Sequence, residues 1–436
     1  MEIMLLAHLA DTHLGYAQYG RSWREEDVYR VFSEAFEKAL SEGVDVIVIS
    51  GDMFDRYRPP NRALKVAMEV VRKALDRGVR VYSILGEHDI PKRYDEVPQI
   101  LVSGLKLLGT HKTPSHDIVT IDDRDYAIAG ISHYPPTLKH LSKLKERLQS
   151  LRSVLRNHKS ILMLHQNIKQ FFALEEGLDI NDIPREVNYV ALGHLHRRII
   201  SRLEEGTVIA YPGSLEILRS DEIDEWLSNG KGFYIVDLSS DEPIIHKVDV
   251  DVRPQLRISA KYPNHVISVK NAVARLRSLG VGIKWDRGIL HVDIELPMSK
   301  KELGRDVVGE VVNAVGPSIY LRTKVKIVKN VERIPEIEGL RGIDEVGIIA
   351  KLLGVEGDIG ERLAKLIIKL KNILAEIEEG DWSTYVDEIL KFESVWRGKV
   401  AQLKIPERRV VAAKPEVSKE KLQPKGKGLL KFLGGS

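Results

Sequence analysis

The sequence predicts an α/β fold with more than one layer boundary, followed by a small α+β unit and a helical C-terminal segment. Short runs rich in Val, Ile and Leu alternate with helical stretches over residues 1–250. Strand-like and helix-like segments alternate again over residues 253–329, and helical periodicity follows residue 343. Because nearly continuous apolar strands are typical of sheets covered on both faces, we expect the sheets of the first part to lie between other layers.

Eight apolar runs are the strand candidates of the first part. They are "IMLLAHLA", "VDVIVIS", "VRVYSIL", "DYAIAGI", "SILMLH", "VNYVALG", "TVIAYP" and "GFYIVDL". Residues 25–43 and 61–78 are expected to be helices, and both stretches end at Gly, a residue that often terminates a helix.

The α+β unit is expected to contain the strands "QLRISA", "GILHVDIEL" and "YLRTKVKIV", with a helix after each of the first two. The segment that follows it, "NVERIPEIEGLRG", has the composition of a linker. We therefore divide the chain into an α/β domain at 1–252, the α+β unit at 253–330, a linker at 331–342, a helical module at 343–398 and a flexible basic tail at 399–436.

Two apolar stripes at helical spacing run through the helical module. Two helices that pack on each other would account for them. Because two lone helices leave much apolar surface uncovered, docking onto a partner helix is the alternative. The residues expected to bind such a partner are Ile359, Leu363, Leu366, Leu370, Trp382, Tyr385 and Ile389.

Composition and charge limit the class of protein. Charged residues make up 30% of the chain and hydrophobic residues 43%, as in soluble globular proteins. The chain has no Cys, which excludes disulfides, thiolate catalysis and zinc–thiolate sites and fits an intracellular protein. Residues 397–436 carry 11 Lys or Arg against 3 Asp or Glu, so this tail can add salt-sensitive affinity for DNA.

Five strand ends share one pattern, in which an apolar run is followed by a tight cluster of Asp, Glu, Asn and His. The clusters contain Asp11 and His13; Asp52 and Asp55; Glu87, His88 and Asp89; His165 and Asn167; and His194 and His196. Ligands of α/β sheets bind beyond the carboxyl ends of strands, so the clusters are expected to converge. Imidazoles mixed with carboxylates suit Mn²⁺ or Fe²⁺.

Each cluster alone is a weak signal, because a His at a strand end is often structural and Asp is common in turns. Five clusters at successive strand ends favour a metal site. The remaining nine histidines are assigned to structural or surface roles: His8, His111, His116, His133, His140, His158, His246, His265 and His291.

In this order the motifs "DTH", "GDMFD", "GEHD", an isolated strand-end His and "GHLH" resemble those of the calcineurin-like metallophosphoesterases. More narrowly, "ADTHLGY" and "GDMFDRYRPP" resemble the double-strand-break repair nucleases of the bacterial SbcD and archaeal Mre-eleven type. The resemblance implies a four-layer α/β/β/α sandwich at 1–252, a capping, DNA-binding domain at 253–330 and an ATPase-binding module at 343–398.

The resemblance also implies a site for two Mn²⁺ ions. Asp11, His13 and His196 would hold one ion, and His165 and His194 the other. Asp52 would bridge the two ions. His88 would assist the scissile phosphate or the leaving oxygen without binding metal, and Asp89 would orient its imidazole. Asp55 and Asn167 would support the ligands from outside, or be purely structural.

Glu87 departs from the family pattern, which has an Asn as a ligand at this position. Its carboxylate is also a suitable oxygen ligand for Mn²⁺, so we expect it to bind the second ion and to make that ion a weaker Lewis acid. The alternative is that Glu87 turns away and pairs with an Arg or a Lys.

Aromatic and basic residues are interleaved beside the expected site. Such residues suit a DNA backbone and unstacked bases, although a solvated loop that packs on its own helix would look the same. The candidates for DNA contact are Tyr16, Tyr19, Arg21, Arg24, Arg56 and Arg58.

The expected function is Mn²⁺-dependent hydrolysis of DNA phosphodiesters, as exonuclease and single-strand endonuclease, in double-strand-break repair. By resemblance the chain would be a cytoplasmic, nucleoid-associated homodimer that works with an SMC-like coiled-coil ATPase of the SbcC or Rad-fifty type. The alternatives are a phosphoesterase of the same fold that acts on nucleotides or phosphoproteins, and a non-catalytic scaffold that clamps DNA for its ATPase.

Overall fold

The computed structural model describes residues 4–91, 96–109, 115–203, 206–240 and 242–328, together with Glu361, Ala364 and Lys365. The chain divides into one unit at residues 1–330 and another at 331–436. The seven residues predicted to bind a partner, Ile359, Leu363, Leu366, Leu370, Trp382, Tyr385 and Ile389, lie outside the described residues. The proposed domain boundaries stay predictions.

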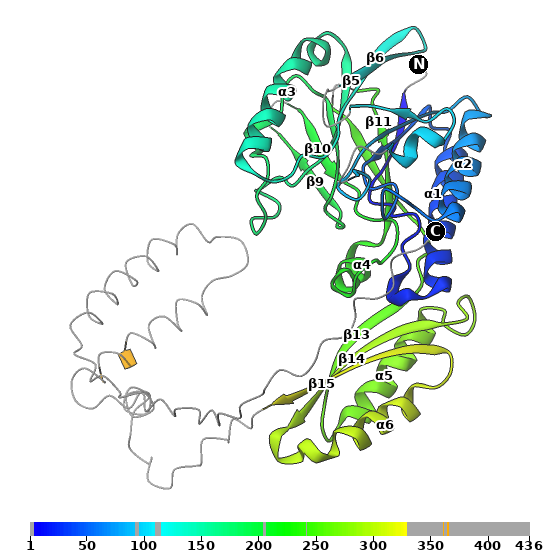
Figure 1. The fold of residues 1–436 in the computed structure, drawn as a ribbon, viewed down its shortest axis with the longest axis vertical. Coiled ribbons are helices and arrows are strands. Elements are labelled where there is room, and N and C mark those ends of the chain that lie inside the picture. Colours follow the sequence, from blue (N-terminus) through cyan, green and yellow to red (C-terminus); the bar gives the residue numbers. More distant parts are fainter. Residues whose placement is uncertain are drawn as a thin grey trace, which may run out of the picture. The chain divides into compact units, whose positions relative to one another are not determined.

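The first sheet has six strands in the order β12-β11-β1-β2-β3-β4. They are β1 (Leu5–Leu9), β2 (Val46–Ser50), β3 (Arg80–Ile84), β4 (Lys106–Leu107), β11 (Gly232–Asp237) and β12 (Ile244–Asp249). Strands β1 to β4 are parallel, and β11 and β12 extend the sheet in antiparallel fashion. Helices α1 (Ser22–Ser41) and α2 (Asn61–Leu75) pack on its outer face (Figure 1).

The second sheet has six strands in the order β5-β6-β7-β8-β10-β9. They are β5 (Ser115–Ile121), β6 (Arg124–Ile131), β7 (Lys159–His165), β8 (Tyr189–Gly193), β9 (Ile199–Arg202) and β10 (Val208–Tyr211). Helix α3 (Leu138–Asn157) covers the outer face with a row of buried leucines at helical spacing, Leu141, Leu144, Leu148, Leu151 and Leu155.

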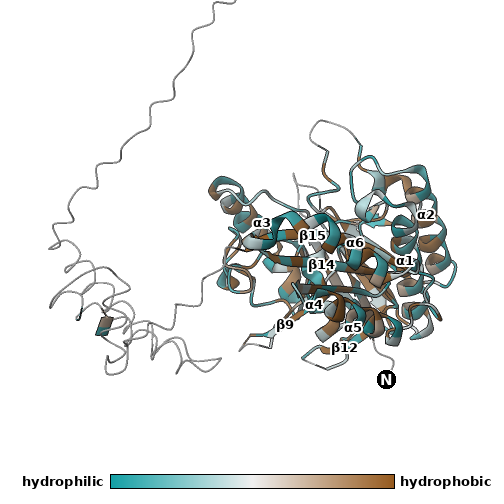
Figure 2. Ribbon diagram, turned by 90° about the horizontal axis from the view of Figure 1, so that it is seen from below, coloured by the Kyte–Doolittle hydropathy of each residue, from teal (hydrophilic) through white to brown (hydrophobic). Residues whose placement is uncertain are grey.

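A core of buried apolar residues also lies between the two sheets. It contains Leu6, Val48 and Tyr82 of the first sheet and Ile128 and Met163 of the second sheet. The layers therefore follow the order α/β/β/α, which confirms the predicted fold class. Figure 2 shows polar and apolar positions on the helices that cover the sheets, as expected of helices with one face against a core.

Residues 253–328 form a separate three-stranded parallel sheet with its own core. Its strands are β13 (Gln255–Lys261), β14 (Gly288–Pro297) and β15 (Ile319–Val328), and its helices are α5 (His265–Ser278) and α6 (Gly304–Val315). The order strand, helix, strand, helix, strand agrees with the sequence pattern.

The eight predicted runs include none of the four edge strands of these two sheets, β4, β5, β9 and β12. Each of these alternates between exposed and partly buried residues along most of its length, so none presents a continuous apolar run. Among the residues that the structure describes, no helix is long and apolar enough to cross a membrane.

Candidate metal centre

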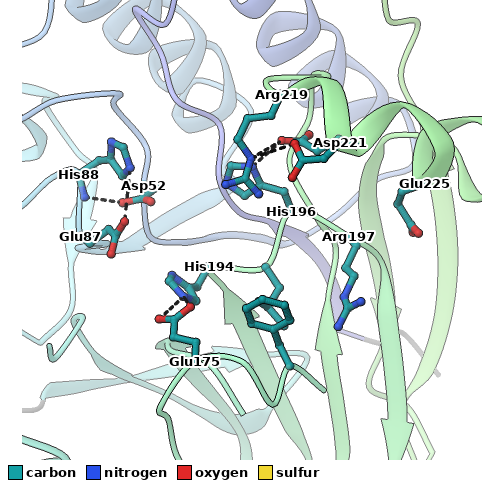
Figure 3. A pocket seen from close by; sticks show the side chains of 13 residues that line it. Asp52, Glu87, His88, Glu175, His194, His196, Arg197, Arg219, Asp221 and Glu225 are labelled. Atoms are coloured by element: carbon teal, nitrogen blue, oxygen red, sulfur yellow. Dashed lines mark hydrogen bonds and ion pairs between the residues drawn. The ribbon is translucent and has the colours of Figure 1, made fainter. Parts of the chain in front are cut away.

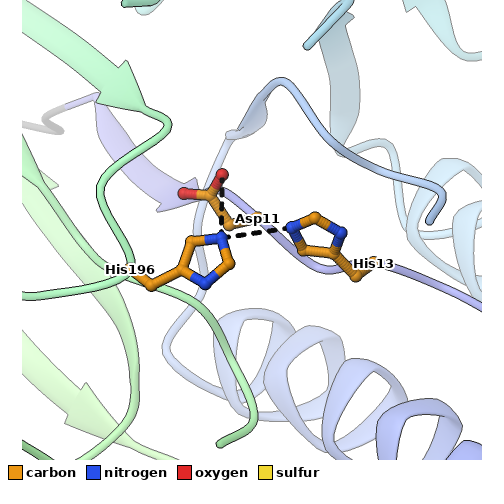
Figure 4. A group of neighbouring side chains, drawn as sticks. All are labelled: Asp11, His13 and His196. Atoms are coloured by element: carbon orange, nitrogen blue, oxygen red, sulfur yellow. Dashed lines mark hydrogen bonds and ion pairs between the residues drawn. The ribbon is translucent and has the colours of Figure 1, made fainter. Parts of the chain in front are cut away.

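The five predicted clusters converge where β1, β2, β3, β7 and β8 end. Three overlapping groups of possible ligands form there, with the ligand atoms of each group within 4.8 Å of one another. The groups are Asp11, His13 and His196; Asp11, Asp52 and His165; and His13, Asp52 and His88. Figure 4 shows the first group, in which Asp11 and His13 come from the loop after β1 and His196 from the loop after β8. Residues more than 180 positions apart in the sequence thus share one site.

The backbone of these strand ends is unusual. Asp11, His13, Asp52 and His194 have φ values of 50°, 44°, 49° and 97°. Positive φ is uncommon for residues other than glycine, although less so for Asp and His, and residues with such strained backbone cluster at functional sites. Gly86 is required for space, because a Cβ there would lie 2.0 Å from Oδ1 of Asp52.

In the first ligand group, Nε2 of His13 and Nε2 of His196 are 3.2 Å apart, and Oδ1 of Asp11 lies 3.9 Å from Nε2 of His196. The other ring nitrogen of His196, Nδ1, is hydrogen-bonded to the Glu222 carboxylate at 2.9 Å. Nδ1 of His13 lies 3.7 Å from Asp55. Both rings therefore present Nε2 to the centre.

His165 lies on the other side of Asp52. Its Nδ1 is hydrogen-bonded to the carbonyl oxygen of Ser50 at 2.8 Å, and its Nε2 lies 3.3 Å from Oδ2 of Asp52. That Nε2 is buried without a hydrogen-bond partner. Burial lowers the pKa of the imidazole, but the carboxylates of Asp52 and Asp11 outweigh it and raise this pKa to about 10.

These observations fit a divalent cation. The two carboxylates favour positive charge beside an imidazole nitrogen that nothing else satisfies. Burial raises the pKa of Asp52, yet the neighbouring His165, His13 and His88 hold it well below its usual range, so the group is a carboxylate at neutral pH. Carboxylate and imidazole donors are those that Mn²⁺, Fe²⁺ and Zn²⁺ accept.

Two of the predicted ligands are not in these groups. Nε2 of His194 lies 3.0 and 3.1 Å from the two carboxylate oxygens of Glu175. The Glu87 side chain is 49% exposed, with Oε1 3.6 Å from Nε2 of His88. Glu87 thus has neither the metal-ligand geometry that we expected nor an Arg or Lys partner among the ion pairs of the described residues.

The structure corrects the role predicted for Asp89. Its buried carboxylate accepts hydrogen bonds from the backbone N–H groups of Met53, Phe54 and Gly86 at 3.0–3.2 Å. Nδ1 of His88 is instead hydrogen-bonded to the carbonyl oxygen of Asp55 at 2.8 Å. Asp89 therefore connects the loop after β2 to the loop after β3. Burial, together with the charge of Asp52, raises the pKa of the Asp89 carboxyl group to about 6.

A pocket of about 770 Å³ opens over the centre (Figure 3). Its acidic lining residues are Asp52, Glu87, Glu175, Asp221, Glu222 and Glu225. Arg197 and Arg219 are its basic lining residues. A pocket so rich in carboxylates repels an anionic phosphate unless cations neutralise it.

Of the residues predicted to contact DNA, Tyr19 and Arg21 lie against strands β14 and β15. The Tyr19 hydroxyl is 3.1 Å from Nε2 of His291, and its ring stacks on Tyr320 at a centroid distance of 5.8 Å. Arg21 donates a hydrogen bond to the Tyr320 hydroxyl at 3.3 Å. These residues connect the α/β region to residues 253–328.

The structure corrects the DNA contact predicted for Arg24. It is 1% exposed, and its guanidinium group is held by Asp27 at 2.6 Å and by Glu216 at 3.1 Å, so it supports the interior and does not reach a DNA backbone. Tyr16 is half-buried against the core, whereas Arg56 and Arg58 are exposed beside the second cluster. Arg56 lies 3.4 Å from Asp55.

Sequence reasoning missed three residues of the centre. Glu222 and Glu175 contact the imidazoles of His196 and His194 but lie in no recognisable motif. His133, which we assigned to a structural or surface role, is buried beside His165 and His194, at ring-centroid distances of 5.8 and 6.1 Å. Burial, with the neighbouring His165 and His194, lowers its pKa to about 4.

Comparison with known proteins agrees with this geometry. Residues 4–198 match the family model of the calcineurin-like phosphoesterases. The DNA double-strand break repair protein Mre11 of Sulfurisphaera tokodaii is 35% identical over 293 residues, which cover 66% of this chain and 73% of that protein. Mre11 of Methanocaldococcus jannaschii is 33% identical over 63% of this chain and 74% of its own length. For Mre11 of Aeropyrum pernix the identity is 33%, over 77% of this chain and 83% of that one.

Proposed function

Because the chain belongs to the Mre11 family of calcineurin-like phosphoesterases, we propose that it hydrolyses DNA phosphodiester bonds in double-strand-break repair, using two Mn²⁺ ions. Membership of this family makes the chain a metal-dependent nuclease. The observation that carries the proposal is the position of Asp52. Its Oδ2 lies 3.3 Å from His165 and 3.8 Å from His13, so one carboxylate adjoins both sets of imidazoles.

The residues that would hold the ions are those that the sequence resemblance implies: Asp11, His13 and His196 for the first ion, His165, His194 and Glu87 for the second, and Asp52 between them. The ligand groups that contain Asp11, His13 and His196, and Asp11, Asp52 and His165, support this assignment. Two divalent ions held there would offset the negative charge of the phosphate and activate a water for attack at phosphorus. Glu87 would reach the second ion by a change of side-chain rotamer, because its carboxylate lines the same pocket as Asp52.

His88 has a separate role in the proposal. Its backbone N–H donates to Oδ1 of Asp52 at 2.9 Å, and its Nδ1 is hydrogen-bonded to the Asp55 carbonyl oxygen. Since a carbonyl oxygen only accepts, Nδ1 carries the hydrogen and Nε2 is left for the substrate. Nε2 of the half-exposed imidazole lies at the pocket wall, and it would give a proton to the leaving oxygen only when the ring carries a second proton there.

The substrate proposal keeps Tyr16, Tyr19, Arg21, Arg56 and Arg58 as DNA contacts and drops Arg24. Stacking and phosphate contacts of this kind are sequence-independent, which suits the processing of arbitrary broken ends. The homodimer and the SMC-like ATPase of the Rad-fifty type are proposed on the sequence resemblance, with the helical module at 343–398 as the docking element.

The test is a nuclease assay on end-labelled duplex and hairpin DNA with Mn²⁺, Mg²⁺ or a chelator. Wild-type protein should cleave with Mn²⁺ and not with the chelator, and Asp52→Asn should be inactive. Asp224→Asn, which changes an exposed carboxyl group on α4 (Ile223–Asn229), is the control and should retain activity.

The assay also separates the alternatives. Cleavage of a small chromogenic phosphodiester without cleavage of DNA would favour a phosphoesterase with another substrate. Binding of DNA and ATPase without any Mn²⁺-dependent cleavage would favour the scaffold.

A further inference from the structure

Three imidazoles of the centre share one design. His165 offers Nδ1 to the Ser50 carbonyl, and His196 offers Nδ1 to Glu222. Nδ1 of His13 also faces a carboxylate, that of Asp55, but at 3.7 Å, which is longer than a hydrogen bond. An oxygen acceptor holds the hydrogen on one ring nitrogen, which leaves the lone pair of the other for a cation. In all three rings the nitrogen left over is Nε2.

His194 has the opposite arrangement. Its Nε2 lies between the two oxygens of the Glu175 carboxylate, at 3.0 and 3.1 Å, so the hydrogen of the ring belongs on Nε2. The nitrogen left for a cation is then Nδ1. The backbone of His194 is fixed as well, because its N–H lies 3.1 Å from both oxygens of Asp11. Figure 3 shows the His194 and Glu175 side chains facing each other.

Glu175 is carried by a loop that is clamped to the end of β7. The Nδ2 atom of Asn167 donates hydrogen bonds to the carbonyl oxygens of Phe172 and Glu175, at 2.8 and 2.7 Å. The backbone N–H of Leu178 closes the loop on the carbonyl of Asn167 at 3.0 Å. Gly177 is required for this closure, because a Cβ there would lie 2.2 Å from that carbonyl oxygen.

We propose that Glu175 is the positioning residue of the second ion site: it holds the His194 imidazole with Nδ1 free for the ion, and Asn167 holds Glu175 in place. The inference rests on the two-ion centre of the proposed function. It also assigns a task to Asn167, for which the sequence left a supporting and a purely structural role open.

The adjacent residue provides a matched control. Glu176 follows Glu175 in the same loop, but its exposed carboxylate pairs with Lys169 and not with a residue of the centre. A change at either position alters the charge of the loop by the same amount. Only the change at Glu175 removes the acceptor of His194, so the pair separates positioning from charge.

The experiment is calorimetric titration of the metal-free, full-length protein with Mn²⁺. Wild-type protein and Glu176→Ala should bind two ions each. Glu175→Ala should bind the first ion normally and the second about 10- to 100-fold more weakly, the usual effect of losing the group that orients a His ligand. Glu175→Gln keeps an acceptor oxygen and should recover part of that loss.

Low-temperature electron paramagnetic resonance at two equivalents of Mn²⁺ gives a second readout. A spin-coupled pair is expected in wild-type protein and in Glu176→Ala, and an increased uncoupled signal in Glu175→Ala.

If Glu175→Ala binds two ions with wild-type affinities, the inference about Glu175 is wrong, but the two-ion centre is unaffected. Equal weakening of both ions would also overturn it, because that result indicates a general distortion. A single ion in wild-type protein would overturn the two-ion centre, and the inference with it.

Discussion

Replacing Glu222 with Gln is expected both to destabilise the protein and to loosen the first ligand group. One oxygen of Glu222 is hydrogen-bonded to Nδ1 of His196 at 2.9 Å, and the other lies 2.6 Å from Nζ of Lys231. The Glu222 and Lys231 side chains are 5% and 2% exposed, so the pair is shielded from water. Removing the carboxylate charge leaves Lys231 buried without a counter-ion.

The magnitude follows from that burial. Removal of one partner of a buried ion pair costs roughly 3–5 kcal/mol, because the remaining charge is left desolvated. Loss of a His-orienting carboxylate weakens metal affinity by roughly 10- to 100-fold. Both effects should therefore appear in Glu222→Gln: a lower free energy of unfolding, and weaker binding of the ion held by His196.

The stability effect should depend on pH. Burial raises the pKa of Glu222, but Lys231 and His196 outweigh it and hold this pKa well below its usual range. A carboxyl group with a lowered folded-state pKa stabilises the protein above its unfolded pKa, roughly 4.3, and that stabilisation is lost as the pH falls toward the folded value. The difference between wild type and Glu222→Gln should be full at pH 7 and shrink below about pH 4.

The assay is urea unfolding, followed by circular dichroism, together with Mn²⁺ titration. The double variant Glu222→Gln/Lys231→Met removes both buried charges, so it should recover much of the stability but not the affinity for the first ion. Asp224→Asn, an exposed change on α4, the helix that begins directly after Glu222, should alter neither quantity. The reasoning is refuted if Glu222→Gln unfolds at the wild-type urea concentration, or if the double variant is less stable than the single one.

His88→Gln should keep both ions and lower the cleavage rate by roughly 10²-fold or more, since a general acid contributes on that scale. If elemental analysis finds less metal in the variant than in the wild type, His88 is a metal ligand instead. Glu87→Asn should remain active, need more Mn²⁺ for half-saturation and turn over at least as fast when saturated, because it removes a negative charge from the second site; an unchanged Mn²⁺ dependence would show that Glu87 does not bind the ion. A chain that ends at Gly342 should remain a folded, Mn²⁺-dependent nuclease that no longer co-purifies with the ATPase, and normal co-purification would exclude the helical module as the docking element.

The metal centre could be predicted from the sequence because its candidate ligands directly follow the strand ends. Asp11 and His13 follow β1 directly, and His194 and His196 follow β8. Parallel strands end at one edge of a sheet, so the clusters after β1, β2 and β3 lie close together, as do those after β7 and β8 of the second sheet. That the two edges face each other is decided by the packing of the two sheets. The β-α-β-α-β order of residues 253–328 was equally visible, because its periodicity changes at each boundary.

Neighbourhood in the sequence was misleading for two residues. Asp89 follows His88, yet its carboxylate binds backbone N–H groups of the two loops while the imidazole faces Asp55. Arg24 lies among aromatic and basic residues typical of a DNA-binding loop, but Glu216, far along the chain, completes its pairing in the interior. Both outcomes depend on tertiary contacts with residues that lie far away in the sequence.

The sequence by itself determined which chemical groups this protein brings to its site, because ligand type and spacing along each strand end are properties of the chain. Only the tertiary structure decided which nitrogen of each imidazole faces the centre. That choice is made by acceptors from other elements: Ser50 for His165, Glu175 for His194 and Glu222 for His196. A ring has two nitrogens, and the one left for a cation depends on which of them a neighbouring oxygen engages.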